Sequence, residues 1–274
     1  MHLAQSLVPA VISYVRRAAD VVPRDKFVHV LAENLPCGIQ GFYTPQHHNN
    51  DEAGGFVRTI LVLNAKGGSG KTTLATNIAG FFADRGHSVA LADFDVQHSS
   101  IDWLAAREAD RPEIKGIDAA NHGLRVPSGI EVLVIDAPAA THGEALSSLV
   151  RRAQTILIPV IPSPVDVRAA EHFLAELMEV RVIERHEVKV ATIANRAREG
   201  TQATAELGEY LEQIKLPSGR KLPFLAHLRS SVNYLRAAER GLSIFEFAPM
   251  ATQPDRECWA PVTRWLASAR SMPE

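Results

Sequence analysis

The feature that most constrains this chain is a glycine-rich turn between an apolar run and a helix-like pattern. The stretch ILVLNAKGGSGKTTLATNIAG spans residues 60–80, with KGGSGKTT at its centre. The run before the turn is short, apolar and β-branched, as expected for a buried strand. Glycines let backbone N–H groups converge on an anion, and a following helix adds the positive end of its dipole. The stretch therefore predicts a phosphate-binding loop.

The loop contains two lysines, Lys66 and Lys71, five positions apart. In a strand–loop–helix of this kind the second lysine reaches the β- and γ-phosphates, and the hydroxyl of Thr72 ligates Mg²⁺. The residues thus predict ATP and Mg²⁺ as ligands. Lys66 is not needed for this arrangement, and from the residues alone it is either a solvent-exposed loop lysine or a further phosphate contact.

Length and composition fit one large α/β domain or two small ones. The chain has 274 residues and a formal net charge of −2, so any nucleic-acid surface has to be a local patch. Its two cysteines, Cys37 and Cys258, form neither a disulfide framework nor a metal pair. We find no apolar run of membrane-spanning length and no signal peptide, and expect a cytoplasmic protein.

The first 57 residues differ from the rest. We expect residues 1–57 to be an N-terminal extension or linker, with a helix-like stretch at 3–22; a docking segment for a partner is the alternative. The pair His47–His48 lacks further ligands at metal spacing, which favours a solvated loop. From residue 58 to 274 strand and helix patterns alternate. Alternation predicts an α/β fold: a doubly wound, mostly parallel sheet with helices on both faces.

Three expectations about individual elements are specific enough to test. The apolar positions of residues 165–183 predict one long helix, and residues 261–270 predict a terminal helix. Only about ten residues separate the strand patterns IKGIDAA and EVLVIDAP, so no helix is expected between them. Ligands of such a sheet bind at the carboxyl ends of the strands.

Carboxylates follow two of the predicted strands. Asp93 and Asp95 lie just past the second strand, and Asp136 follows four apolar residues in VLVID. A carboxylate at the end of such a strand can hold a Mg²⁺-bound water. The competing interpretation for all three is a turn aspartate or a helix N-cap.

These motifs together resemble those of the ParA/MinD family of deviant Walker A ATPases. The family loop reads x-K-G-G-x-G-K-[ST], which AKGGSGKT matches with Ala65 at the first position. DFDVQHS is similar to the first switch, D-x-D-P-Q-x-S, with Val96 in place of proline, and DAPA resembles the second switch. The resemblance covers residues 58–266. It implies a P-loop NTPase fold and an ATPase that forms a homodimer on binding ATP.

The resemblance also implies roles for individual residues. Lys66 would contact the nucleotide of the other subunit, Asp95 would orient the attacking water, and Asp93 would lie near the Mg²⁺ shell with Thr72 and Asp136. Asn195 stands where relatives contact the adenine. The loop residues implied to bind ATP are Lys66, Gly67, Gly68, Ser69, Gly70, Lys71, Thr72 and Thr73.

Basic residues in the late part of the chain suggest a macromolecular partner. They are Lys215, Arg220, Lys221, Arg229, Arg236 and Arg240, with Glu239 the one acid among residues 214–240. ParA-type relatives use such residues to hold nonspecific DNA, which implies a nucleoid-associated protein with a ParB-like or cargo-adaptor partner that stimulates hydrolysis. The cargo would be a plasmid, a chromosome or a protein assembly such as a carboxysome or chemoreceptor cluster.

Two other functions stay open. One is a MinD-like regulator held on a membrane by its C-terminal helix, but the stretch PVTRWLASARSMPE is short and weakly basic, which favours a helix docked on the core. The other is an ATP-dependent ligase similar to dethiobiotin synthetase, which would need a further substrate pocket.

Overall fold

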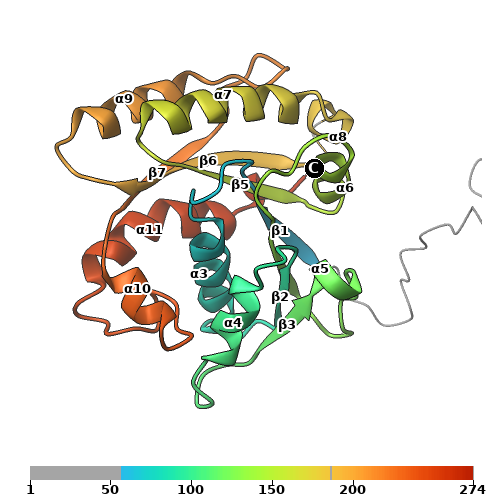
Figure 1. The fold of residues 1–274 in the computed structure, drawn as a ribbon, viewed down its shortest axis with the longest axis vertical. Helices are drawn as coiled ribbons and strands as arrows, with labels where there is room; N and C mark the ends of the chain where they lie inside the picture. The colour runs from blue at the N-terminus through green and yellow to red at the C-terminus, as the bar shows by residue number, and fades with distance from the viewer. Residues whose placement is uncertain (1–56, 186, 274) are drawn as a thin grey trace, which may run out of the picture. The chain divides into compact units, whose positions relative to one another are not determined.

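The computed structural model describes residues 57–185 and 187–273, drawn in colour in Figure 1. The helix expected at residues 3–22, the pair His47–His48 and Cys37 lie outside the described residues. The expected division of the chain at residue 57 stays a prediction for the same reason.

Within these ranges seven strands form one sheet, and every pair of neighbouring strands runs parallel. The order across the sheet is β3-β2-β4-β1-β5-β6-β7. The strands are β1 Arg58–Val62, β2 Val89–Asp93, β3 Ile114–Asp118, β4 Val132–Asp136, β5 Thr155–Val160, β6 Lys189–Ala197 and β7 Phe224–Arg229. The order changes direction around β1, which places the chain after β1 at the kind of crevice where α/β sheets bind ligands.

The helices cover both faces of the sheet, as predicted. They are α3 Lys71–Ala83, α4 Ser99–Ala105, α5 Ala119–His122, α6 Gly143–Val150, α7 Pro164–Met178, α8 Arg181–Glu184, α9 Gln202–Gln213, α10 Asn233–Ala238 and α11 Gln253–Leu266, followed by the 3₁₀ turn η1 Ala269–Ser271. In Figure 1, α7 and α9 lie on one side of the sheet and α3 and α11 on the other.

The core has two layers because the sheet is apolar on both faces. Side chains of α6, α7 and α9 pack on one face together with Leu61 and Leu63, and side chains of α3, α4 and α11 pack on the other with Ile60 and Val62. Successive residues of β1 therefore point to opposite faces, and both faces exclude water. Because β1 is buried on both of its faces, it is a rigid support for the loop that follows its carboxyl end.

Three elements differ from the sequence predictions. The helix expected over 165–183 ends at Met178, because Val180 is extended (φ −72°, ψ 120°) and starts the separate helix α8. The terminal helix begins at Gln253 and carries Pro261 in its interior, so that proline does not mark the start. The four-residue helix α5 stands where no helix was expected.

The terminal helix α11 belongs to the core. Trp259, Val262 and Leu266 are fully buried. This agrees with the expectation of a docked helix rather than a membrane-bound one.

Candidate nucleotide-binding site

The glycine-rich loop joins β1 to α3 and is fastened at its start and at its end. At the start, the Asn64 amide donates to the carbonyl oxygen of Pro159 at 2.6 Å, and its oxygen accepts from the Lys66 N–H at 2.9 Å. At the end, Gly70 precedes α3 with φ +90°, a conformation that favours glycine. A Cβ at Gly70 would lie 2.2 Å from the Asn195 amide nitrogen, so this position also lacks room for a side chain.

Lys71 is the first residue of α3, and its side chain lies beneath the loop. The residue is 7% exposed, and its Nζ lies 3.4 Å from the carbonyl oxygen of Lys66. Burial lowers the pKa of Lys71, while the nearby carboxylates of Asp136 and Asp95 act in the opposite direction. The ammonium group thus lies between the loop and two of the predicted acidic residues.

Asp136 ends β4 and is almost completely buried. Its Oδ2 accepts a hydrogen bond of 2.7 Å from the Ser100 hydroxyl. Burial raises the pKa of Asp136 to about 6, although the hydroxyls of Ser100 and Thr72 lower it. The pKa shows that burial of the charged carboxylate is incompletely compensated by protein groups.

Two buried polar atoms of the site have no hydrogen-bond partner within the described residues. They are Oδ1 of Asp136 and Oγ of Ser69. A buried polar atom without a partner costs free energy, and native proteins leave few of them. The carboxylate oxygen of Asp136 and the hydroxyl of Thr72 are the kind of oxygen ligands that Mg²⁺ prefers. The hydroxyl of Ser69, in the loop, can donate to a phosphate. The residues present therefore fit a magnesium-bound phosphate.

Asp93 is a helix-capping residue in the structure. Its Oδ2 accepts from the N–H groups of Ser100 (2.8 Å) and Ile101 (3.3 Å) in the first turn of α4, and its Oδ1 accepts from the N–H of Asp95 (2.9 Å). These bonds engage both carboxylate oxygens and satisfy N–H groups in the first turn of α4, although the N-cap position itself is occupied by His98 and not by Asp93. The role of Asp93 near Mg²⁺ stays a prediction.

Asp95 differs from Asp93 in its exposure. It is half-buried, and one oxygen accepts from the Gln97 N–H at 3.0 Å. Its carboxylate is close enough to Lys71 to raise the pKa of that lysine. Asp95 therefore lies near Lys71, as predicted, and its role in hydrolysis stays a prediction.

Asn195 contacts the loop itself. Its amide donates to the carbonyl oxygen of Ser69 at 2.8 Å, and the side chain is buried near the end of β6. The structure thus gives Asn195 a bracing role that the sequence did not predict. Its expected contact with adenine stays a prediction.

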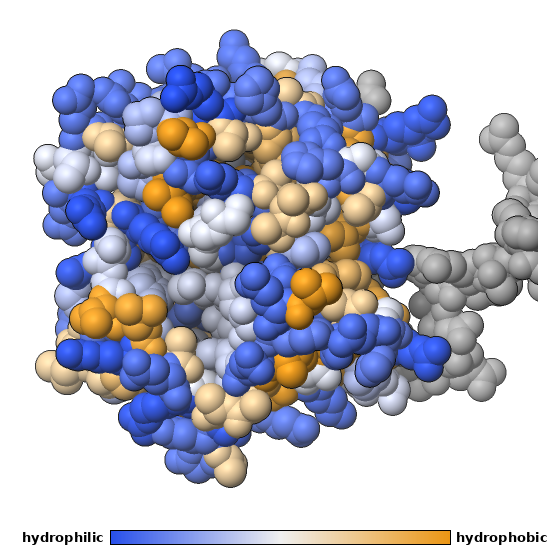
Figure 2. Space-filling model, in the orientation of Figure 1, coloured by the Kyte–Doolittle hydropathy of each residue, from blue (hydrophilic) through white to orange (hydrophobic). Residues whose placement is uncertain are grey.

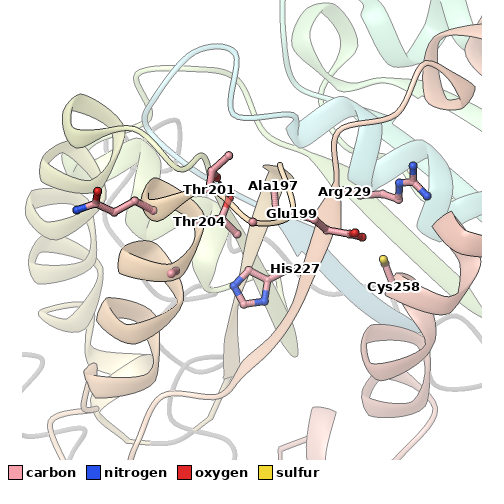
Figure 3. A pocket seen from close by; sticks show the side chains of 10 residues that line it. Ala197, Glu199, Thr201, Thr204, His227, Arg229 and Cys258 are labelled. Carbon is pink, nitrogen blue, oxygen red and sulfur yellow. Dashed lines mark hydrogen bonds between the residues drawn. The ribbon is translucent and has the colours of Figure 1, made fainter.

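A cavity of about 750 Å³ is lined by Ala197 and by residues that follow it in the chain, starting two positions after Asn195. Figure 3 shows that it extends between α9 and α11, with Thr201 and Thr204 on one side, His227 in the middle, and Arg229 and Cys258 on the other. Its lining combines apolar surface with a few hydroxyl and charged groups, which is typical of pockets for small molecules.

The predicted basic residues fall into two groups with different surroundings. Lys215, Arg220 and Lys221 belong to the turn between α9 and β7 and are exposed. The others lie around α10, where Arg229 is 3.5 Å from a carboxylate oxygen of Asp255 and Arg240 forms an ion pair with Glu108. The sequence pattern identified these basic residues, but it did not identify Asp255 and Glu108, the acidic residues that pair with two of them.

Sequence reasoning missed Ser100. The hydroxyl and N–H of Ser100 bind Asp136 and Asp93 respectively, and the residue is fully buried. The motif comparison ended at the neighbouring Ser99. A second hydroxyl directly after the motif was the available signal.

Hydrophobic side chains on the face shown in Figure 2 form small, separate groups among hydrophilic ones. Within the part of the chain that the structure describes, no helix is both long and apolar enough to cross a membrane.

With the geometry established, comparisons with known proteins give the family. Residues 60–244 match the model of the CobQ/CobB/MinD/ParA nucleotide binding domain. The chain therefore belongs to this family, as the loop and switch motifs predicted.

Two relatives are similar over most of their length. "Maintenance of carboxysome distribution protein A" of Gloeobacter kilaueensis is 31% identical over 203 residues, which are 70% of this chain and 86% of the relative. "Chromosome-partitioning ATPase Soj" of Thermus thermophilus is 26% identical over 228 residues, 70% of this chain and 89% of the relative.

The fold has solved counterparts. A putative plasmid partition protein of Borrelia burgdorferi, solved with AMPPNP bound, superposes with a TM-score of 0.58 and 14% identity, covering 76% of this chain and 99% of that one. This likeness confirms the predicted P-loop fold.

Proposed function

We propose that this protein is an ATP-dependent molecular switch of the ParA type that positions a cargo. The observation that carries the proposal is a pair of buried atoms, Asp136 Oδ1 and Ser69 Oγ, which have no hydrogen-bond partner among the described residues and lie in the same site as the buried Lys71. A magnesium-bound triphosphate would supply a partner for each of these groups. Without a ligand, the same groups are destabilising.

The residues divide the chemistry of ATP hydrolysis among them. Lys71 and the loop hold the phosphates, while Thr72 and Asp136 would hold Mg²⁺, which neutralises charge on the phosphate oxygens when bound. Asp95, half-buried beside Lys71, orients the attacking water. Phosphoryl transfer needs little covalent help from the protein, so positioning and charge stabilisation suffice.

The nucleoside would lie toward the cavity that follows Asn195. Its lining of threonines and apolar atoms suits a base and ribose. Because Asn195 also braces Ser69, contact of the base with this region would be coupled to the shape of the phosphate loop.

The remaining steps are proposed from the relatives. ATP joins two copies of the chain, with Lys66 of each contacting the nucleotide of the other, and the dimer binds DNA nonspecifically. A ParB-like or cargo-adaptor protein stimulates hydrolysis and releases the dimer. Relatives named for carboxysome distribution and for chromosome partitioning make a protein assembly or a chromosome the favoured cargo.

A gel shift with nonspecific duplex DNA tests the switch. Asp95→Ala should slow hydrolysis and accumulate the ATP state, so the variant should bind DNA with ATP more strongly than the wild type does. Binding should be weak with ADP and should fall with salt, because phosphate contacts release counterions. Lys71→Ala is the matched control and should show no response to ATP. DNA binding that is the same with ATP, ADP and no nucleotide would contradict the proposal.

A further inference from the structure

A second cavity lies at the opposite end of the sheet from the phosphate loop. It has a volume of about 320 Å³ and is bounded by the first residues of β6, the turn before β7, the end of α11 and η1. The phosphate loop leaves the carboxyl end of β1, whereas this cavity lies where β6 and β7 begin. Strands of six residues separate the two ends by about 20 Å.

The charge of this cavity is unusual for a slightly acidic protein. Among the described residues, four cations line it and no lining residue is acidic: Lys189, Arg220, Lys221 and Arg270. In the part of the chain that the structure covers, Arg220, Lys221 and Arg270 form no ion pair, whereas Arg229 and Arg240 near α10 each lie against a carboxylate. The positive charge of these three side chains is therefore not balanced by an ion pair within the described residues.

The cavity also contains an aromatic wall. Trp265, at the end of α11, is half-buried and lines the cavity together with apolar side chains of α8 and β6. Guanidinium groups bind phosphate with two parallel hydrogen bonds, and indole rings stack on nucleobases. Cations and an aromatic ring around one small cavity thus match the two halves of a nucleotide.

We propose that this cavity binds one nucleotide unit of a single-stranded nucleic acid. The phosphate lies on Arg220 and Arg270, and the base packs against Trp265. The volume is near the lower limit of small-molecule pockets and suits one unit. Lys215, exposed on the same turn as Lys221, extends the positive surface to a neighbouring phosphate, which favours a strand over a free nucleotide. This site goes beyond the proposed ATP switch and does not depend on it.

Tryptophan fluorescence of the full-length protein tests the proposal directly. The other two tryptophans of the chain, Trp103 and Trp259, are buried in the core. We expect an oligothymidylate of eight nucleotides, added without ATP, to quench the fluorescence. The Trp265→Phe variant should lose the quenching, and Trp265→Ala should bind a labelled oligonucleotide about 10-fold more weakly by anisotropy.

A pair of double variants tests the charged wall of the cavity. Arg220→Gln with Arg270→Gln should weaken binding at least about 10-fold and lower the salt slope by about 0.7 for each phosphate that is no longer neutralised. Arg151→Gln with Arg168→Gln, at two exposed arginines that do not line the cavity, is the matched control and should bind like the wild type.

Three results would overturn the assignment: wild-type affinity in the Arg220/Arg270 variant, quenching that persists in Trp265→Phe, or equal affinity for the free nucleotide dTMP. The gel shift with duplex DNA and ATP reports on the proposed switch separately. If that shift depends on ATP and on Arg236 and Arg240 only, the switch stands and this cavity is not its DNA contact.

Discussion

At the scale of single residues, the site is polarised before any ligand binds. Lys71 and Asp136 are both buried, and the burial of each shifts its pKa toward the neutral form. Such burial is unfavourable unless a bound group compensates it. A magnesium-bound phosphate carries charges of both signs, so the buried residues that are unfavourable without a ligand are those that we propose bind nucleotide.

Removal of the Lys71 ammonium group should therefore mainly weaken ATP binding. Lys71→Ala should weaken ATP binding by about 10- to 100-fold, because a charge-assisted hydrogen bond contributes about 1.5–3 kcal/mol. Calorimetric titration with ATP and Mg²⁺ measures this. Lys66→Ala is the control, since its side chain is predicted to act across the dimer interface and should leave ATP binding largely intact. Unchanged affinity in Lys71→Ala would refute the loop assignment.

Ser100 offers a second test, because its hydroxyl fixes the orientation of the Asp136 carboxylate. Ser100→Ala should raise the Mg²⁺ concentration needed for half-maximal hydrolysis several-fold, while Ser100→Thr should restore it. A general loss of stability would lower the activity at every Mg²⁺ concentration. It would not shift the Mg²⁺ concentration needed for half-maximal hydrolysis. If Ser100→Ala has the wild-type Mg²⁺ dependence, the positioning role is wrong.

At the scale of elements, α4 connects the nucleotide site to the late part of the chain. Asp93 caps its first turn, and Ser100 in that turn holds Asp136. Just past its end, Arg107 donates to the carbonyl oxygen of Gly241 at 2.9 Å and pairs with Glu246 at 2.5 Å. The side chains of this pair are 6% and 1% exposed. These bonds join the stretch that contains Asp93 and Ser100 to the segment that follows α10.

Breaking this buried pair should be costly, because one charge would be left uncompensated. Arg107→Ala should lower the free energy of unfolding by about 3 kcal/mol or more. Urea denaturation at neutral pH measures it, and Arg151→Ala, at an exposed arginine that ends α6, serves as the control. If the free energy of unfolding falls by less than about 1 kcal/mol, the pair contributes no more than a solvent-exposed ion pair, and this prediction is wrong.

The same pair predicts how stability depends on pH. Burial raises the pKa of Glu246, but the hydrogen bonds from Arg107 and Ser243 outweigh burial and hold the pKa below its ordinary value. Since the pKa is lower in the folded state, this contribution to stability is complete above the ordinary glutamate pKa and is lost as pH falls through the folded value. Unfolding free energies measured from pH 6 downward should fall less steeply for Glu246→Gln. Parallel curves for the two proteins would contradict this.

How far the sequence predicted these elements depended on the type of signal. Strong apolar runs with β-branched residues placed the strands of the sheet, and the glycine-rich loop placed the site. The end of α7 was missed because the apolar pattern continues through Val180 into α8, so periodicity alone cannot show the turn. The start of α11 was missed because Pro261 is tolerated inside a helix that is anchored by Trp259 and Leu266.

At the scale of the whole molecule, the sequence predicted which residues meet beside the glycine-rich loop but not the hydrogen bonds among them. The positions of Lys71, Thr72, Asp95 and Asp136 follow from strand ends meeting at one edge of a parallel sheet. The bond from Asn195 to Ser69 and the capping role of Asp93 depend on side-chain direction across 126 and 7 residues respectively, which no local pattern encodes. The neutralisation of Arg229 and Arg240 is tertiary in the same way.

In the function proposed above, ATP converts this chain from a monomer into a dimer through its two loop lysines. Light scattering coupled to size exclusion tests it, with Asp95→Ala used to preserve ATP during the run. We predict that Asp95→Ala has the mass of one 29.9 kDa chain with ADP and twice that mass with ATP. Adding Lys66→Ala to this variant should return the mass to one chain while ATP stays bound. An ATP-saturated Asp95→Ala protein with the mass of a single chain would contradict the account.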